Sequence, residues 1–299
     1  MKIIKKRPKH IHVLPNVITA FGLSCGLFVI FKMAMVPNGT LDYNGALTVA
    51  GVLLLACLAD ALDGAVARAI KAESYFGGIF DSLSDAITFG VCPSIVVIKS
   101  LSAEPKTEIS FFLISAAMIY SVCGVLRLAR FSVQAKQAQE NPDLLKDHKK
   151  NFTGLPIPAA AGAIVSATLV FYSPELKSLF TLSKAFESWI LIAMLVVVGY
   201  LMVSRLKFPS QKNLHIRVAS FRMVFLFVVS AVLLLYGLIS YFAVVFFLSF
   251  WGYICVSLVF FLMRIIFGHK SKTLEEYEPD PTDIIESESV LEDEENFGE

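Results

Sequence analysis

Charge, cysteine and histidine are all scarce in this 299-residue sequence. Lys, Arg, Asp and Glu make up only 17% of it, and cysteine and histidine occur five times each. All five cysteines lie in apolar segments without a C-x-x-C pair, so we expect small buried hydrophobic residues there. The histidines flank apolar segments, where we expect them to be solvated rather than bound to a metal. Neither residue type therefore indicates a functional site.

Long runs without charge exclude an ordinary soluble domain. The sequence is 56% apolar and has 25 phenylalanines, whereas a soluble domain is about 45–50% apolar. Several windows exceed the roughly 18 nearly uncharged residues that cross a hydrocarbon core of about 30 Å. We therefore predict an all-α, polytopic membrane bundle of about eight transmembrane helices. The expected spans are 15–36, 44–68, 79–99, 109–131, 155–172, 187–206, 219–237 and 241–267.

The apolar runs also divide the chain into four parts. Residues 1–13 form a basic juxtamembrane segment, and residues 14–208 form a transmembrane core of about six helices. Residues 209–268 hold two further transmembrane helices, and residues 269–299 form an acidic tail that we expect to be disordered. The first apolar run is too long for a cleaved signal peptide and lacks a small-residue cleavage signature.

Basic residues are divided unevenly between the two sides of this topology. With eight spans, 21 of the 26 Lys and Arg residues fall on the side that holds both termini. Because Lys and Arg accumulate in cytoplasmic loops, we expect both termini to be cytoplasmic. An error of one helix would scramble the asymmetry, so the clean split supports eight spans.

Four aspartates interrupt the second and third apolar runs. Asp60 and Asp63 are spaced i, i+3, and Asp81 and Asp85 are spaced i, i+4, so each pair lies on one helix face. The two pairs are expected to face each other near the cytoplasmic interface. Carboxylates this close repel one another unless some are protonated or divalent cations lie among them. Oxygen ligands favour hard cations such as Mg²⁺, Mn²⁺ or Ca²⁺ over zinc.

Glycines and an arginine lie between the two pairs. Gly64 and Gly77 would let a phosphorylated ligand approach the backbone closely, and Arg68 would pair with a phosphate. Two metals a few ångström apart would clamp a pyrophosphate or phosphoryl centre. The alternative is that the aspartates merely end two helices at the interface, which leaves their spacing unexplained.

The spacing D-x2-D-G-x2-A-R-x8-G-x3-D-x3-D resembles the signature of the CDP-alcohol phosphatidyltransferase family. Its specified positions are filled by Asp60, Asp63, Gly64, Ala67, Arg68, Gly77, Asp81 and Asp85. The resemblance implies a membrane homodimer with a cytoplasm-facing cavity that binds a CDP-linked lipid through two divalent cations, Mg²⁺ or Mn²⁺. Such an enzyme transfers a phosphatidyl group to an alcohol and releases CMP, which would make residues 14–208 the catalytic core.

Carried over residue by residue, the resemblance implies two sets of site residues. The metal ligands would be Asp60, Asp63, Asp81 and Asp85, and Asp85 would also be the base that deprotonates the acceptor hydroxyl. The residues that bind the cytidine diphosphate would be Asn16, Thr19, Gly64, Ala67, Arg68 and Gly77. From the residues alone, Asn16 and Thr19 either satisfy backbone groups or line a polar site.

Further blocks resemble the phosphatidylserine synthase branch, which transfers the phosphatidyl group of CDP-diacylglycerol to L-serine. They are Leu14–Thr19, Asp81–Leu83 with Phe89–Pro93, Arg127–Phe131, Phe152–Ala160 and Met202–Phe208. Two positions depart from the pattern: Ile79, where the branch often has Glu, and Ser132, where it often has Asn. The partners expected are CDP-diacylglycerol, L-serine and membrane lipid, with no nucleic acid, in a prokaryotic inner membrane.

The acceptor pocket is a separate question, because the aspartates do not identify the alcohol. Serine is a zwitterion, so its carboxylate needs a cationic partner. The candidates at cytoplasmic helix ends are Arg127, Arg130, Arg205 and Lys207. For each of them, the alternative is an ordinary basic residue that reaches toward the interface. We expect Arg127 or Arg130 to bind the acceptor carboxylate or a substrate phosphate.

Three other functions compete with this interpretation. The same transfer to glycerol 3-phosphate or an inositol phosphate would call for more clustered basic residues, and transfer to choline for an aromatic or anionic cage. A divalent-cation transporter would place charges along a path through the membrane, but all four aspartates sit at one end. A structural scaffold would leave the aspartates without a purpose.

Overall fold

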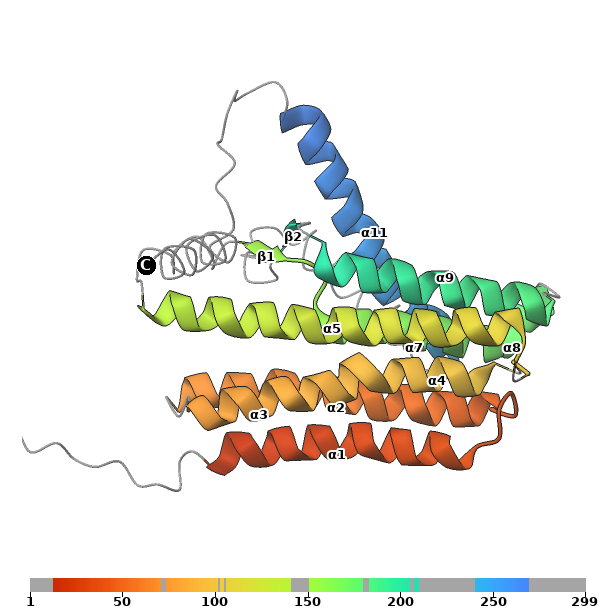
Figure 1. Ribbon diagram of the computed structural model, residues 1–299, viewed down its shortest axis with the longest axis horizontal. Helices are drawn as coiled ribbons and strands as arrows, with labels where there is room; N and C mark the ends of the chain where they lie inside the picture. Colours follow the sequence, from red (N-terminus) through yellow and green to blue (C-terminus); the bar gives the residue numbers. More distant parts are fainter. Residues whose placement is uncertain are drawn as a thin grey trace, which may run out of the picture. The chain divides into compact units, whose positions relative to one another are not determined.

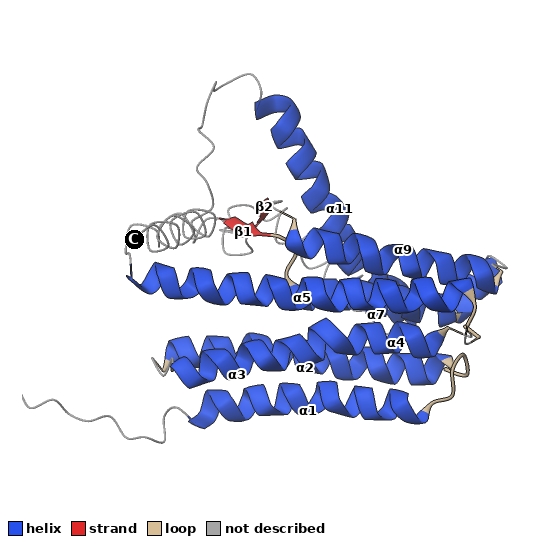
Figure 2. Cartoon of the chain, viewed as in Figure 1, coloured by secondary structure: helices blue, strands red, loops and turns tan. Residues whose placement is uncertain are grey.

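The computed structural model describes residues 13–70, 74–101, 103–104, 106–140, 151–179, 183–204, 207–209 and 240–268. Nearly all of these residues are helical, so the expected all-α class is confirmed (Figures 1 and 2). The helices are α1 (Val13–Met35), α2 (Tyr43–Ala69), α3 (Tyr75–Asp85), η2 (Ala86–Val91), α4 (Cys92–Ser100), α5 (Glu108–Glu140), α7 (Ile157–Tyr172), α8 (Pro174–Leu179), α9 (Lys184–Val203) and α11 (Phe242–Gly268). The strands are β1 (Asn151–Thr153) and β2 (Lys207–Pro209).

Within the described residues, six helical stretches are long and apolar enough to cross a membrane, and α7 is a shorter apolar helix. The six are Val13–Met35, Tyr43–Ala69, Tyr75–Ser100, Glu108–Val133, Lys184–Val203 and Phe242–Met263. Together with α7, these helices match all of the expected spans but one, and the chain is an integral membrane protein. The remaining span, 219–237, lies outside the described residues, as do residues 1–12 and the acidic tail 269–299.

The chain divides into two compact units, Met1–Ser257 and Leu258–Glu299. The first unit holds every element from α1 to β2 and α11 as far as Ser257, and the described part of the second is the end of α11. Within the first unit, α1 packs on α2 and α3, while α5 packs on α9. These helices run alongside one another (Figure 1). The boundary expected at residue 209 stays a prediction.

Small residues let α1 approach its neighbours closely. Gly22 and Gly26 lie four residues apart on one face of α1, a spacing that favours close packing of membrane helices. A Cβ built on Gly22 would lie 3.5 Å from the Cβ of Ala59 on α2. A Cβ built on Gly26 would lie only 2.5 Å from the Oγ1 of Thr88 on η2. The first and third expected spans are therefore in direct contact through Gly26.

The third span changes its helical repeat in the middle. Its central turn, η2, is a π-helix, and the amide of Cys92 bonds the carbonyl of Ile87. Pro93 has no amide hydrogen, so it cannot donate to the Phe89 carbonyl as a residue in a regular α-helix would. The buried Tyr120 hydroxyl of α5 donates to that carbonyl at 3.0 Å. A side chain from another span thus replaces the missing backbone hydrogen bond.

An antiparallel pair of strands, which the sequence did not suggest, joins the residues before α7 to those after α9. Phe152 of β1 is paired with Phe208 of β2. Gly154 follows β1 with a φ of 82°, and a Cβ there would lie 2.4 Å from the carbonyl oxygen of Met202. Glycine is suited to this backbone and to this close approach. The Leu155 amide then donates to the Leu201 carbonyl at 3.0 Å.

Candidate metal centre and active site

The carboxylates lie where α2 ends and α3 begins. Asp60 and Asp63 are in the last turns of α2, while Asp81 and Asp85 are in the second half of α3. Ser74 precedes α3 and accepts a hydrogen bond from the amide of Gly77 at 3.0 Å. Because serine is a favoured N-cap, this bond fixes where α3 starts. The start of α3 in turn sets the depth of its two aspartates.

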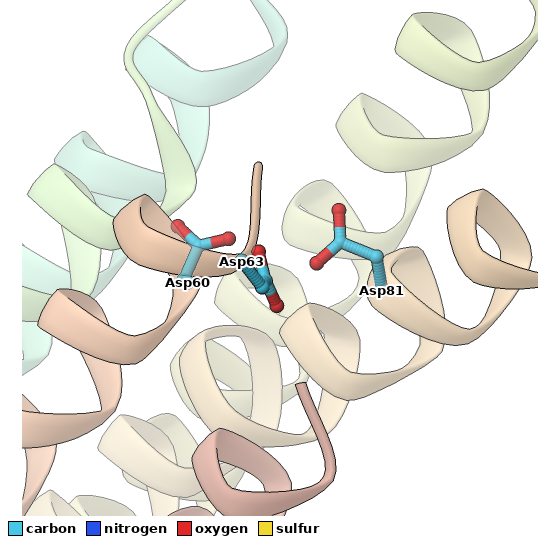
Figure 3. Close-up of side chains that lie close together, drawn as sticks. All are labelled: Asp60, Asp63 and Asp81. Atoms are coloured by element: carbon cyan, nitrogen blue, oxygen red, sulfur yellow. The ribbon is translucent and has the colours of Figure 1, made fainter. Parts of the chain in front are cut away.

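Three of the four aspartates converge. Carboxylate oxygens of Asp60, Asp63 and Asp81 all lie within 4.8 Å of one another. Figure 3 shows Asp81 on α3 directed toward the two aspartates of α2. Asp63 is buried, with 4% of its surface exposed, and the other two are half-buried. The convergence of the two aspartate pairs expected from the sequence is present for these three residues.

The fourth carboxylate, Asp85, lies slightly apart. It is half-buried and lines the same small cavity as the other three, but it does not belong to the set within 4.8 Å. Arg127 of α5 lies close enough to attract it electrostatically. The structure therefore separates a compact set of three carboxylates from a fourth that faces a cation of the chain.

The donor set suits a hard divalent cation. All three convergent groups are carboxylates, which are the ligands that Mg²⁺, Mn²⁺ and Ca²⁺ prefer. Arg68 attracts Asp63 electrostatically, but among the described residues no cation attracts Asp60 or Asp81. Like charges this close in a partly buried site call for positive charge from elsewhere. The residues present thus fit a bound divalent metal.

Helix α1 brings two polar side chains to the centre. The Thr19 hydroxyl donates to the carboxylate of Asp63 at 2.5 Å and also lies 3.1 Å from the Pro15 carbonyl. Asn16 Oδ1 lies 3.0 Å from where a Cβ on Gly77 would be. Thr19 therefore lines the cavity between the aspartates, whereas Asn16 lies beside the backbone of α3.

Three more residues expected to bind the nucleotide lie in the last turns of α2. Arg68 is exposed in its last turn, and its guanidinium lies over Gly64, 3.3 Å from where a Cβ would be. Ala67 is half-buried in the same turn. Gly64, Ala67 and Arg68 thus follow the two aspartates of α2 on the last turns of that helix.

The four basic residues expected at the acceptor pocket have different surroundings. Arg127 is half-buried, its Nε has no hydrogen-bond partner among the described residues, and Asp85 attracts it. The Arg130 guanidinium donates to the Val203 carbonyl at the end of α9, at 3.4 Å. Arg205 lies outside the described residues, and for Lys207 only the backbone, in β2, is described. Of the two whose side chains are described, Arg127 is the one that lies near an aspartate, Asp85.

Several residues that line the centre were not among the predicted site residues. Gly22, Ser84 and Thr88 line the cavity between the aspartates, which has about 10 Å³ open to the centre of a water-sized sphere. A signal for two of them was present, because positions 81, 84, 85 and 88 follow the i, i+3, i+4, i+7 spacing of one helix face. Both hydroxyl-bearing residues therefore share the face that carries the aspartates.

A much larger cavity lies at the other end of the helices of this unit. Its volume is about 830 Å³, and it is lined by residues near the start of α2, the end of α4 and the start of α9. Charged side chains of both signs surround it, among them Glu104, Lys177 and Glu187. None of the predicted site residues lines it.

Comparison with known proteins shows which family the chain resembles. Residues 12–201, more than half of the chain, match the model of the CDP-alcohol phosphatidyltransferase family. The archaetidylserine synthase of Methanothermobacter thermautotrophicus is 33% identical over 66% of this chain and 69% of its own length. The CDP-diacylglycerol–serine O-phosphatidyltransferase of Mycobacterium leprae is 30% identical over 70% of this chain and 61% of its own length. The enzyme of that name from Helicobacter pylori is 29% identical over 73% of this chain and 80% of its own length.

The family match and the local geometry agree. The matched range contains α1 to α8 and most of α9, and therefore all three convergent aspartates and the cavity between them. Helix α11 lies outside the matched range. This chain belongs to the CDP-alcohol phosphatidyltransferase family.

Proposed function

We propose that this chain transfers the phosphatidyl group of CDP-diacylglycerol to the hydroxyl of L-serine, giving phosphatidylserine and CMP. The convergence of Asp60, Asp63 and Asp81 in a member of this family carries the proposal. The names of the three relatives described above support serine as the acceptor, because each name contains it.

The carboxylates have two tasks in this reaction. Asp60, Asp63 and Asp81, completed by Asp85, would hold two divalent cations, Mg²⁺ or Mn²⁺, whose positive charge would offset the charge of the donor pyrophosphate. Asp85 takes the proton of the serine hydroxyl while the serine oxygen bonds to the phosphatidyl phosphorus. The bond from that phosphorus to the bridging oxygen breaks, and CMP leaves with the electron pair. The position of Asp85 outside the compact set of three carboxylates supports its role as the base.

The cytidine diphosphate lies against the ends of α1, α2 and α3 in this proposal. Arg68 is exposed at the end of α2, where its guanidinium can face a phosphate of the donor. The other residues that contribute are Asn16, Thr19, Gly64, Ala67 and Gly77. Thr19 acts through Asp63, because its hydroxyl donates to that carboxylate.

Arg127 is the residue that binds the serine carboxylate in this proposal. In the part of the chain that is described, its Nε has no hydrogen-bond partner, and the guanidinium and Asp85, the proposed base, attract each other. A serine held there would present its hydroxyl toward Asp85. Arg130 has its guanidinium at the Val203 carbonyl instead, so its proposed task is to hold the end of α9. Arg205 and Lys207 stay predictions.

We also infer the setting of the enzyme from the pattern of its charges. The excess of Lys and Arg on one side supports a cytoplasmic position for both termini and for the aspartates. The proposed location is a prokaryotic inner membrane, and the proposed assembly is a homodimer, as the family resemblance implies.

The test is transfer to a panel of alcohols. Purified protein in lipid nanodiscs receives CDP-diacylglycerol, Mn²⁺ or Mg²⁺ and one acceptor at a time: L-serine, glycerol 3-phosphate, inositol phosphate or choline. The expected result is CMP release that depends on L-serine and on the metal, and that stops in EDTA. Release with another alcohol alone would overturn serine as the acceptor. Metal flux into liposomes without CMP release would favour a transporter instead.

A further inference from the structure

Helix α11 packs one of its faces against the helices that carry the site. Phe246 and Ser257 are buried on this face. Tyr253, which is half-buried, follows Phe246 by seven residues and precedes Ser257 by four, so the three share one side of the helix. The indole nitrogen of Trp251 donates to the Ala163 carbonyl at 3.0 Å and so holds α11 on α7. Tyr253 therefore lies on the side of α11 that faces the other helices of its unit.

Contacts with α7 give the direction of this face. Phe246 belongs to the same cluster of buried residues as Val165. One turn further along α11, the ring of Phe250 lies over Gly162, where a Cβ would overlap it. Along α11 the contacts thus move toward the start of α7, so the two helices run antiparallel. The next turn of α11, which holds Tyr253, lies toward the start of α7.

The start of α7 lies beside the part of α5 that carries Arg127. A Cβ on Gly124 of α5 would lie 3.2 Å from the Cδ1 of Ile157, the first residue of α7. Arg127 follows Gly124 by three residues, about one helical turn. Tyr253 and Arg127 are close enough to interact electrostatically. Helix α11 thus brings a phenol to the arginine that Asp85 also attracts.

The proposed reaction gives this phenol a task that Asp85 cannot perform throughout. When Asp85 takes the proton of the acceptor hydroxyl, its negative charge is lost, and its attraction for Arg127 weakens with it. A half-buried guanidinium still needs a polar partner at that moment, because burying a charge without one is costly. A tyrosine hydroxyl accepts a hydrogen bond from a guanidinium without carrying a charge of its own. The phenol therefore suits a partner that stays the same before and after proton transfer.

We propose that Tyr253 is a positioning residue for the acceptor: its phenol holds the Arg127 guanidinium where that group binds the serine carboxylate, so α11 completes the acceptor site. The inference rests on the proposed transfer to L-serine and on the proposed role of Arg127. Tyr253 acts through Arg127 and does not touch the substrate. The family match ends at residue 201, so this contribution comes from a part of the chain outside it.

The test separates binding of the acceptor from binding of the donor. Tyr253→Phe removes only the hydroxyl, and CMP release is measured with L-serine and CDP-diacylglycerol varied in turn. We expect the KM for L-serine to rise about fivefold, as for the loss of one hydrogen bond, with kcat and the KM for CDP-diacylglycerol within about twofold. Tyr241→Phe is the matched control, since it makes the same change at an exposed residue just before α11, and both KM values should stay unchanged.

A second measurement asks whether Tyr253 acts through Arg127. Tyr253→Phe is added to Arg127→Lys, and the two single variants are compared with the double variant. Because residues that act together have non-additive effects, we expect Tyr253→Phe to change the KM for serine by less than about twofold in the Arg127→Lys background. A full fivefold increase there would show that Tyr253 acts independently of Arg127 and would overturn the inference.

The other contrary outcomes are distinct. An unchanged KM for serine in Tyr253→Phe would overturn the inference, as would an equal rise of both KM values with a lower melting temperature, which indicates a packing role. If Tyr253→Phe does not fold, Tyr253→Leu is compared with Tyr253→Gln, since only the second keeps a group that hydrogen-bonds; equal KM values for serine would again overturn it. If the unchanged protein releases no CMP with L-serine, the proposed function itself fails before any variant is compared.

Discussion

The two ends of the helices in the unit Met1–Ser257 differ in how deeply their charged side chains are buried. At one end, four aspartates are half-buried or buried around a cavity of about 10 Å³. At the other, side chains of both signs, such as Glu104 and Lys177, are exposed around a cavity of about 830 Å³. Exposed charges are solvated and cost little to keep there, whereas buried like charges are held against their repulsion.

This contrast shows that the size of a cavity and its chemistry can point to different places. A search by volume would choose the large cavity, where the charged residues need no further partner. The small cavity is too narrow for a substrate, but its carboxylates require a cation, and the exposed Arg68 marks the solvent side of the same helix end. The catalytic end is identified by four buried or half-buried carboxylates, one of which, Asp85, attracts half-buried Arg127.

The largest expected effect comes from removing the proposed base. Asp85→Asn should lower kcat about 10²- to 10⁴-fold, the usual contribution of a general base, while CDP-diacylglycerol still binds. Steady-state CMP release and binding of the labelled donor measure the two effects. The matched control is Glu187→Gln at the large cavity, the same change of carboxylate to amide, which should leave kcat within about twofold. Full activity in Asp85→Asn would remove Asp85 from the base role.

A smaller effect is expected where α1 meets the third span. Gly26→Ala would place a methyl group 2.5 Å from Thr88 Oγ1 and 3.0 Å from the Thr88 Cα. Because the backbone of η2 must move, we expect a loss of about 2 kcal/mol in the free energy of unfolding, within the usual range for overpacking. Thermal melting in detergent measures this loss. Gly51→Ala is the control, since nothing lies within 4 Å of its Cβ position, and an equal loss there would contradict the account.

The spans and the aspartate centre could be predicted because their signals are local. Runs without charge marked α1 and α2 to within a few residues, and the spacing of the aspartates placed each pair on one face. The π-helical turn could not be predicted in the same way, because the hydrogen bond from Tyr120 to Phe89 joins residues 31 positions apart. The hydrogen bond from Arg130 to Val203 joins residues 73 positions apart, so the local spacing of residues could not predict it either.

A weaker effect is expected at the acceptor pocket. Arg127→Lys keeps the positive charge but loses the two-pronged guanidinium, so we expect the KM for L-serine to rise about tenfold with little change for CDP-diacylglycerol. Arg130→Lys is the matched control, and its KM for serine should stay within about twofold, because its guanidinium lies at the Val203 carbonyl. Initial rates at varied serine give both values. A KM increase confined to Arg130→Lys would exchange the proposed tasks of the two arginines.

The smallest expected effect lies between the two ends, at the change of helical repeat. Tyr120→Phe removes the hydroxyl that replaces the backbone bond lost at Pro93, and the Phe89 carbonyl is then unpaired. We expect a loss of about 1 kcal/mol in stability, since one hydrogen bond is removed in an otherwise packed site. Tyr200→Phe, on an exposed position of α9, is the control and should not change the melting temperature. If Tyr120→Phe melts like the control, Pro93 alone accounts for the π-helical turn, and the third span needs no support from α5 to present its aspartates.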